Sequence, residues 1–374
     1  MLIVVKGKLL IACLILFAST VAGTAGAHQS APSPNAVIST RGVIKKLAAD
    51  GTRFAVVTTA RRGKCGAIVV WTAPDRRSTS LGARGCPSLL CPAVCVNSLA
   101  LGAGRVAWGT YDGGNDLELA VWTTGLSGRA AKEIDFVTNH NGAGGDPDGG
   151  YVGPLFGAGV VLAYNQWTIC EATGDPHAGF CSPVDPVTHH VLAKDQLKLV
   201  SAAGKSVVVR QGADAYRLDA VGGGRIAVQS AGEGDITVLA PSGEELATVL
   251  SIRRDPPRAI ALSKKWLAVE RKSTLDLVDP SNGVAGASIT LGAEAPLLLG
   301  GVNSTLVMLR SAKRLVLVRL SDGKRQSLTL QRGTKPIVDA RLTEAGLFYA
   351  YNVPRASAKG RIVFEPTAKL LARF

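Results

Sequence analysis

Short apolar runs separated by turn residues extend along most of the chain, and one stretch shows the pattern in full. Within residues 216–250, four runs rich in Val, Ile and Leu are separated by Gly222-Gly223-Gly224, by a polar turn and by Pro241-Ser242-Gly243. Apolar runs of this length, separated by such turn residues, are typical of β-strands joined by tight turns. The stretch therefore predicts a four-stranded antiparallel meander.

The opening of this meander recurs along the chain as a signature. It consists of a small residue, often a basic residue, and then an apolar run with a small residue in its middle. The later copies lie about 40 residues apart, which is the period of a four-stranded propeller blade. The seven copies are residues 53–57, 105–108, 160–164, 225–228, 266–269, 305–308 and 347–350.

A further apolar run follows most copies of the signature, and helical periodicity is nearly absent. Without helices, the sheets have to cover one another, and radial stacking of blades does this. We therefore predict an all-β fold, a β-propeller with seven blades of four antiparallel strands, as a single domain over residues 43–374. Two β-sandwich domains are the alternative. Either residues 37–40 or residues 369–374 supply the outermost strand of the last blade.

These repeats resemble the secreted, WD40-like β-propeller repeats of bacteria, in the broad sense that includes TolB-type propellers. The resemblance covers most of residues 43–374, but the Trp-Asp dipeptide and the Gly-His pair of true WD40 repeats are missing. It implies a scaffold for interactions. Propellers serve many activities, so the fold alone does not give the function.

The first residues have the features of a targeting segment. Lys6 and Lys8 precede an apolar stretch, and Ala25-Gly26-Ala27 offers a cleavage site before His28. We predict a signal peptide at 1–27, an N-terminal segment at 28–42, no transmembrane segment in the mature chain, and a secreted or extracytoplasmic location at the cell surface or in the periplasm. A retained membrane anchor and lipidation at Cys13 are the alternatives.

The charge is strongly basic. Loss of Lys6 and Lys8 with the leader lowers the formal net charge from +14 to +12. Such a balance favours anionic surroundings. Nucleic acid is a weaker candidate, because the Lys and Arg residues are scattered and are not interleaved with aromatic ones. We expect a protein or an anionic cell-envelope polymer as the partner, and a monomeric chain.

The cysteines fit an oxidising compartment. Six remain after cleavage, and sequence alone does not choose among their pairings. Cys170 and Cys181 lie apart from the others within a loop insertion near residues 165–190, so we predict a disulfide between them. The other four, which we expect to form two bridges of unknown pairing, are Cys65, Cys86, Cys91 and Cys95. A zinc site from Cys86, Cys91 and Cys95 lacks the usual spacing.

Two acidic, Gly-rich stretches are candidate binding loops. Carboxylates spaced by flexible residues can surround calcium, and Asp146 and Asp148 are the candidate metal ligands. Turns in which Asp, Asn and Gly serve backbone geometry are the simpler interpretation. The candidate binding residues of this region, with the two aromatic residues beside it, are Asp112, Asn115, Asp116, Asp146, Asp148, Tyr151 and Trp167.

Catalytic motifs are missing from the sequence. It contains no GxSxG elbow, no HExxH and no Walker loop. Charges expected near the central channel are few for a hydrolytic centre: Lys45, Lys46, Arg217, Asp219, Arg258, Asp339 and Arg341. We predict a non-catalytic scaffold that binds its partner through the loop face and needs no cofactor. The alternative is a calcium-dependent hydrolase or lyase acting on sugars or lactones.

Overall fold

The computed structural model divides the chain into two compact units, Met1–Ala31 and Pro32–Phe374, and every described residue belongs to the second. The described residues are 36–59, 67–73, 77–81, 96–113, 116–128, 131–140, 149–171, 190–192, 195–212, 216–230, 234–250, 255–292, 297–311, 313–328, 336–353 and 359–374.

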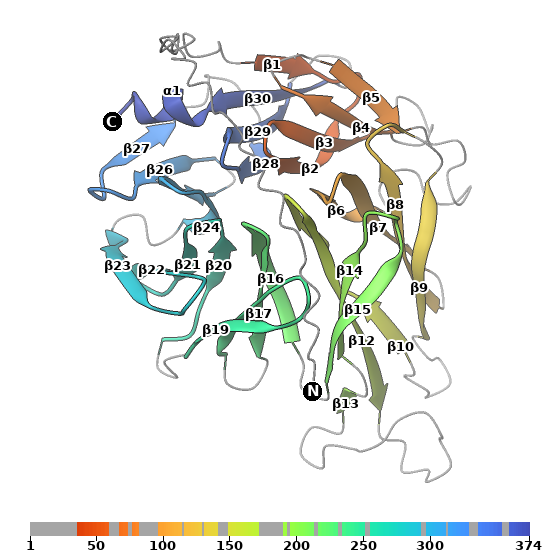
Figure 1. Ribbon diagram of the computed structural model, residues 1–374. Coiled ribbons are helices and arrows are strands. Elements are labelled where there is room, and N and C mark those ends of the chain that lie inside the picture. The colour runs from red at the N-terminus through yellow and green to blue at the C-terminus, as the bar shows by residue number, and fades with distance from the viewer. Residues whose placement is uncertain are drawn as a thin grey trace, which may run out of the picture. The chain divides into compact units, whose positions relative to one another are not determined.

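Seven blades of four antiparallel strands form a ring (Figure 1). Blade 1 consists of β2 (Ile44–Asp50), β3 (Arg53–Thr58), β4 (Ala67–Thr72) and β5 (Arg77–Leu81). Blade 2 consists of β6 (Val96–Gly102), β7 (Arg105–Gly113), β8 (Asp116–Gly125) and β9 (Lys132–His140). Blade 3 consists of β11 (Phe156–Ala158), β12 (Val161–Glu171), β14 (Asp195–Val200) and β15 (Ser206–Gly212), with β10 (Gly149–Val152) and β13 (His190–Leu192) added to β12.

The remaining blades are more regular. Blade 4 consists of β16 (Tyr216–Gly222), β17 (Arg225–Ser230), β18 (Ile236–Leu239) and β19 (Glu245–Val249). Blade 5 consists of β20 (Ala259–Leu262), β21 (Leu267–Glu270), β22 (Thr274–Val278) and β23 (Ala285–Thr290). Blade 6 consists of β24 (Leu298–Val302), β25 (Leu306–Arg310), β26 (Leu315–Arg319) and β27 (Arg325–Leu328). Blade 7 consists of β28 (Ile337–Leu342), β29 (Gly346–Asn352), β30 (Gly360–Pro366) and β1 (Ala36–Ser39).

The prediction of a seven-bladed propeller is confirmed, and the sandwich alternative is wrong. All seven copies of the signature fall on the second strand of a blade. These strands are buried on both faces between neighbouring blades, as in the run from Phe54 to Thr58. Two-sided burial explains why they appear in the sequence as continuous apolar runs.

The ring closes through its N-terminal strand. β1 pairs antiparallel with β30, with Ala36 opposite Phe364 and Ser39 opposite Arg361. Of the two predicted closing segments, residues 37–40 are therefore the one that contributes. Residues 369–374 instead lie in and after the short helix α1 (Thr367–Leu371), whose Leu370 is buried against blades 6 and 7.

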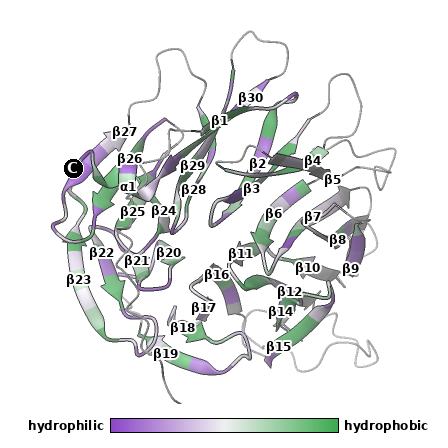
Figure 2. Cartoon of the chain, turned by 45° about the horizontal axis from the view of Figure 1, so that its top comes forward, coloured by the Kyte–Doolittle hydropathy of each residue, from purple (hydrophilic) through white to green (hydrophobic). Residues whose placement is uncertain are grey.

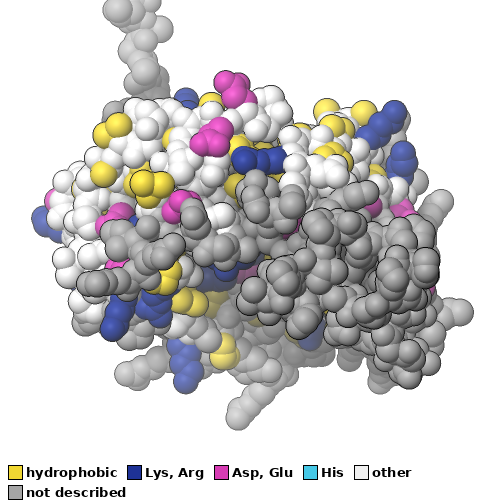
Figure 3. Space-filling model, turned by 90° about the horizontal axis from the view of Figure 1, so that it is seen from below, with side chains coloured by type: hydrophobic (Ala, Val, Ile, Leu, Met, Phe, Trp, Pro, Cys, Tyr) yellow, Lys and Arg dark blue, Asp and Glu magenta, His cyan; other side chains and the backbone are white. Residues whose placement is uncertain are grey.

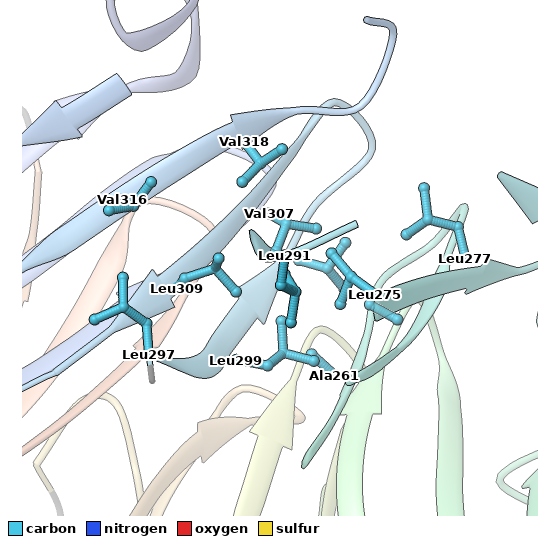
Figure 4. Close-up of a cluster of buried hydrophobic side chains, with 12 residues drawn as sticks. Ala261, Leu275, Leu277, Leu291, Leu297, Leu299, Val307, Leu309, Val316 and Val318 are labelled. Atoms are coloured by element: carbon cyan, nitrogen blue, oxygen red, sulfur yellow. The ribbon is translucent and has the colours of Figure 1, made fainter. Parts of the chain in front are cut away.

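The hydrophobic core lies between blades and not within a central layer. The described residues form seven clusters of buried apolar side chains, one for each pair of adjacent blades. In the cluster between blades 5 and 6, Leu275 and Leu277 of β22 lie on one side and Leu309 and Val316 of blade 6 lie on the other (Figure 4). Each blade is therefore stabilised by its two neighbours.

Consecutive strands of each blade alternate in direction, so the seven inner strands all begin on the same face of the ring. We call this the loop face and the opposite one, where the inner strands end in tight turns, the turn face. Figure 2 shows the inner strands β2, β6, β11, β16, β20, β24 and β28 around the centre of the ring. In the described part of the chain, no helix has the length and apolar character that a membrane span requires.

Candidate functional site

The inner strands carry a bulge near their start in five blades. The pairing register shifts at Ile44/Lys46, Val96/Ser98, Leu218/Ala220, Leu299/Gly301 and Ile337/Asp339. A bulge leaves one residue outside the regular ladder. Backbone groups beside it therefore need other partners, and side chains of the preceding blade supply them.

Three side chains act in this way. Asn352 Oδ1 accepts a hydrogen bond from the Ile44 N–H at 2.8 Å, linking blade 7 to blade 1. Asn165 Oδ1 accepts from the Leu218 N–H at 2.7 Å, linking blade 3 to blade 4. Glu270 Oε2 accepts from the Leu299 N–H at 2.5 Å, linking blade 5 to blade 6. In each case the N–H that donates this hydrogen bond belongs to the residue just before the bulge.

A charged cluster occupies the corresponding place between blades 6, 7 and 1. Arg310 Nη1 lies 2.5 Å from Asp339 Oδ1, and Arg341 Nη2 lies 2.9 Å from Asp339 Oδ2. Arg341 Nε also donates to the backbone oxygen of Leu47 at 3.3 Å. Desolvation lowers the pKa of Arg341, the charge of Asp339 opposes this, and Arg310 adds to it. Two guanidinium groups share one carboxylate, so the cluster keeps a net positive charge.

The inner strand of blade 4 carries a second charged pair. Arg217 Nε lies 2.7 Å from Asp219 Oδ1, and Arg217 Nη2 donates to Gln229 Oε1 at 2.5 Å. Burial raises the pKa of Asp219, and the hydrogen bond and charge of Arg217 oppose this. The Arg217 side chain is 63% exposed, against 14% for Asp219. The guanidinium is therefore oriented by its partners but still faces water.

Blade 5 contributes the third pair. Arg258 lies just before β20, and its Nη1 is 3.9 Å from Glu270 Oε1. Glu270 is fully buried, and desolvation raises its pKa against the opposing effects of the Leu299 N–H and Arg258. Among the described residues at or beside the inner strands near the loop face, the carboxylates Asp219, Glu270 and Asp339 thus each lie beside an arginine.

Most of these charged residues near the loop face were predicted from the sequence, and two of them were missed. Lys45, Lys46, Arg217, Asp219, Asp339 and Arg341 lie on inner strands, and Arg258 directly precedes one. Glu270 and Arg310 were not predicted, because they end the second strands of blades 5 and 6. A polar residue directly after the apolar signature is the signal that could have found them.

The aromatic candidates Tyr151 and Trp167 lie side by side. They are direct partners across β10 and β12, and their rings stack with centroids 6.0 Å apart and planes 17° apart. Both side chains are half-buried. Two residues predicted separately therefore form one aromatic surface on blade 3.

The acidic candidates are described only in part. Asp112 and Asp116 lie at the ends of β7 and β8, where the backbone of Asp112 pairs with Glu118 and that of Asp116 with His140. Their side chains, and the whole of Asn115, Asp146 and Asp148, lie outside the described residues. Within the ranges that the structure describes, no three His, Cys, Asp or Glu side chains are grouped to hold a metal ion. The calcium hypothesis stays a prediction.

The disulfides also stay predictions. The backbone of Cys170 pairs with Val191 at the end of β12. Its side chain lies outside the described residues, as do Cys65, Cys86, Cys91, Cys95 and Cys181.

A buried polar network joins blades 2 and 3. Tyr164 Oη donates to Asp135 Oδ2 at 2.9 Å and lies 2.7 Å from Ser206 Oγ. Lys198 Nζ donates to the same Asp135 oxygen at 2.6 Å and also to Gln166 Oε1. Burial raises the pKa of Tyr164 well above its ordinary value. Because each of these groups has a partner, the network fixes the two blades against each other.

Positive charge is also present outside these pairs. In the view from below, Lys and Arg side chains (dark blue) stand in separate groups among apolar and acidic ones (Figure 3).

Comparison with known proteins supports the fold and no more. No protein-family model and no curated protein sequence matches the chain. An acylaminoacyl peptidase solved with Z-Gly-Gly-Phe-chloromethyl ketone is similar with a TM-score of 0.52 and 11% identity, over 87% of this chain and 51% of that one. The uncomplexed acylaminoacyl peptidase of Pyrococcus horikoshii gives a TM-score of 0.50 with the same identity and coverage.

The Hsv2 protein of Kluyvelomyces marxianus gives a TM-score of 0.47 at 8% identity, over 83% of this chain and 90% of that one. The chain spans about half the length of the two peptidase chains, which each match over 51% of their length.

Proposed function

We propose that this chain is a non-catalytic binding scaffold that takes an anionic polymer on the loop face. The observation that carries this is the pairing of Asp219, Glu270 and Asp339 with arginines. A general base has to be available to the substrate proton, whereas carboxylates held by guanidinium groups serve mainly to orient those groups. Arginine presents five N–H donors, so a paired arginine can still bind an anionic ligand.

The overall charge supports the same function. The formal net charge is +14, or +12 without Lys6 and Lys8 of the leader, and Lys45 and Lys46 on β2 place two of these positive charges at the loop-face end of the inner ring. Long-range attraction of this kind raises the rate at which anionic partners are encountered. An acidic protein surface could bind to the same Lys and Arg side chains, but an anionic polymer is the partner that we favour.

Export belongs to this proposal. The predicted leader at 1–27, the predicted Cys170–Cys181 bridge and the resemblance to secreted bacterial WD40-like and TolB-type propellers support a location outside the cytoplasm, where we expect the protein to be monomeric. The envelope of a bacterial cell is rich in anionic polymers, which fits a basic scaffold.

The test compares two pairs of lysines on opposite faces. Lys45→Ala with Lys46→Ala should weaken binding of poly-glutamate about five- to thirtyfold, because each surface ion pair contributes up to ~1 kcal/mol. Lys205→Ala with Lys264→Ala removes the same charge from exposed positions at the turn face and should leave the affinity within about twofold. Binding is measured by titration calorimetry at two salt concentrations, and higher salt should weaken it.

Equal losses in the two double variants would show that only net charge matters and would contradict a loop-face site. Failure of the unaltered protein to bind any anionic polymer would overturn the proposal.

A further inference from the structure

The stacked pair of Tyr151 and Trp167 lies on a part of blade 3 that has no counterpart in blades 5 and 6. β12 continues six residues past Asn165, whereas β21 and β25 end at Glu270 and Arg310, the corresponding positions. β10 pairs with this extension and brings Tyr151 opposite Trp167. The aromatic pair therefore sits at the loop-face end of the blade.

The backbone around the pair holds the Trp167 ring in place. A Cβ at Gly153 would lie 2.9 Å from Cζ3 and 3.4 Å from Cη2 of Trp167, so the indole lies directly over this glycine. Two residues before Trp167, Asn165 is held by its hydrogen bond with the Leu218 N–H at 2.7 Å. The aromatic surface is therefore formed before any ligand arrives, which lowers the ordering cost of binding.

An oriented guanidinium lies on the next blade. Trp167 follows Asn165 on the same face of β12, about 7 Å further along the strand. Arg217 directly precedes Leu218, to which Asn165 is bonded, and Asp219 and Gln229 orient its guanidinium. The register thus places an aromatic platform and an exposed cation on neighbouring blades at one end of the ring.

We propose that this pair of features binds an acidic polysaccharide. A sugar ring has an apolar C–H face that gains by leaving water against an aromatic ring, and a uronic acid carboxylate matches a guanidinium. The Tyr151–Trp167 pair takes the ring, and Arg217 takes the acid. This inference rests on the proposed function and narrows its anionic polymer to one with sugar rings.

Two polymers separate the two contributions. Hyaluronan carries both sugar rings and carboxylates, and poly-glutamate carries carboxylates alone. Trp167→Ala should weaken hyaluronan binding about three- to tenfold and leave poly-glutamate binding unchanged, because only the first polymer uses the platform. Arg217→Ala should weaken the binding of both acidic polymers, because both carry carboxylates.

Val284→Ala is the control. Val284 is a 61% exposed apolar residue in the turn between β22 and β23 of blade 5, at the turn face. Its removal should leave hyaluronan binding within about twofold. Trp167→Phe keeps an aromatic ring and should restore most of the affinity, which separates loss of the platform from loss of the fold.

The outcomes distinguish this inference from the proposed function. If Trp167→Ala binds hyaluronan as the unaltered protein does, while poly-glutamate still binds, the sugar site is wrong and the anionic scaffold stands. If Trp167→Ala weakens the binding of hyaluronan and of poly-glutamate equally, its effect is not specific to sugar rings, and the inference also fails. If the unaltered protein binds neither acidic polymer, both proposals fail.

Discussion

Glu270 is a buried carboxylate that joins two blades at some cost. Its side chain is fully buried, accepts the Leu299 N–H and lies 3.9 Å from Arg258. Desolvation raises its pKa above the ordinary value of 4.5, because the partners only partly replace the lost water. The charged form is therefore less favourable in the folded protein than in the unfolded chain.

This shift gives a signed prediction for pH. Between the pKa values of the unfolded and folded states, the folded protein holds more protons, so its free energy of unfolding falls as the pH rises. Glu270→Gln can still accept the Leu299 N–H and does not titrate. We expect the stability of the unaltered protein relative to Glu270→Gln to decrease from about pH 4 upward and then level off, as measured by urea unfolding.

Asn165 provides the control, because it makes the same kind of link without a charge. Asn165→Ala leaves the buried Leu218 N–H unpaired and should lower the free energy of unfolding by about 1–3 kcal/mol at every pH in this range. A stability difference between the unaltered protein and Glu270→Gln that is constant with pH would contradict the prediction.

At the scale of single elements, the turns that end the inner strands bring blades into direct backbone contact. A Cβ at Gly222 would lie 2.0 Å from the backbone oxygen of Leu262 in the next blade. The neighbouring Gly223 and Gly224 have positive φ values of 58° and 76°. The three glycines of this turn are thus required for close approach and for backbone conformation.

Gly222→Ala should destabilise the protein by about 1–3 kcal/mol or more, because the obstructing atoms belong to backbone and cannot rotate away. Gly125→Ala at the end of β8 is the control, since its nearest neighbour would be Ser127 Oγ at 3.9 Å. It should change stability by less than about 0.5 kcal/mol. Equal denaturation midpoints for the two variants would show that the turn at Gly222 accommodates a Cβ without loss of stability, which would contradict the prediction.

The regular strands could be predicted from the sequence, and the broken one could not. The second strands are buried on both faces, so Val, Leu and Ala mark them clearly, as at Ala227 and Val228. The inner edge of blade 3 is divided into β10 and β11. Its glycines, with Gly153 and Pro154 between the two pieces, have the composition of a turn.

The candidate site was predicted as a set of residues but not as a set of contacts. Inner-strand charges follow from the repeat, because each copy fixes where the inner strand lies. The partners of Asp339 depend on how blade 6 meets blade 7, and this register is set by packing between distant segments. The stacking of Tyr151 on Trp167 likewise depends on the pairing of β10 with β12, which the sequence does not specify.

At the scale of the whole molecule, β1 holds the ring closed through a few side chains. Ala36 and Ile38 are buried in the cluster between blades 7 and 1, whereas Val37 is 45% exposed. Alternate residues of this strand therefore contribute very differently to stability, although they are neighbours in the chain.

Ile38→Ala should lower the free energy of unfolding by about 2–5 kcal/mol, because it leaves a cavity where the ring closes. Val37→Ala on the same strand should change it by less than about 0.5 kcal/mol. Urea unfolding of the two variants checks this. A loss that is equal in both would mean that pairing with β30, and not burial of Ile38, closes the ring.

The pairing of β1 with β30 also sets an order of events during synthesis. Of the described strands, β1 leaves the ribosome first, and β30, which contains its partner residues Arg361 to Phe364, leaves it last. At ribosomal rates of about 5–20 residues per second, the nascent strand waits for roughly 15–65 s with its apolar side chains unpaired. A chain interrupted before β30 is therefore left with two exposed edges, β1 and β29, that both lack their partner strand, and this makes incomplete products the natural targets of chaperones and proteases.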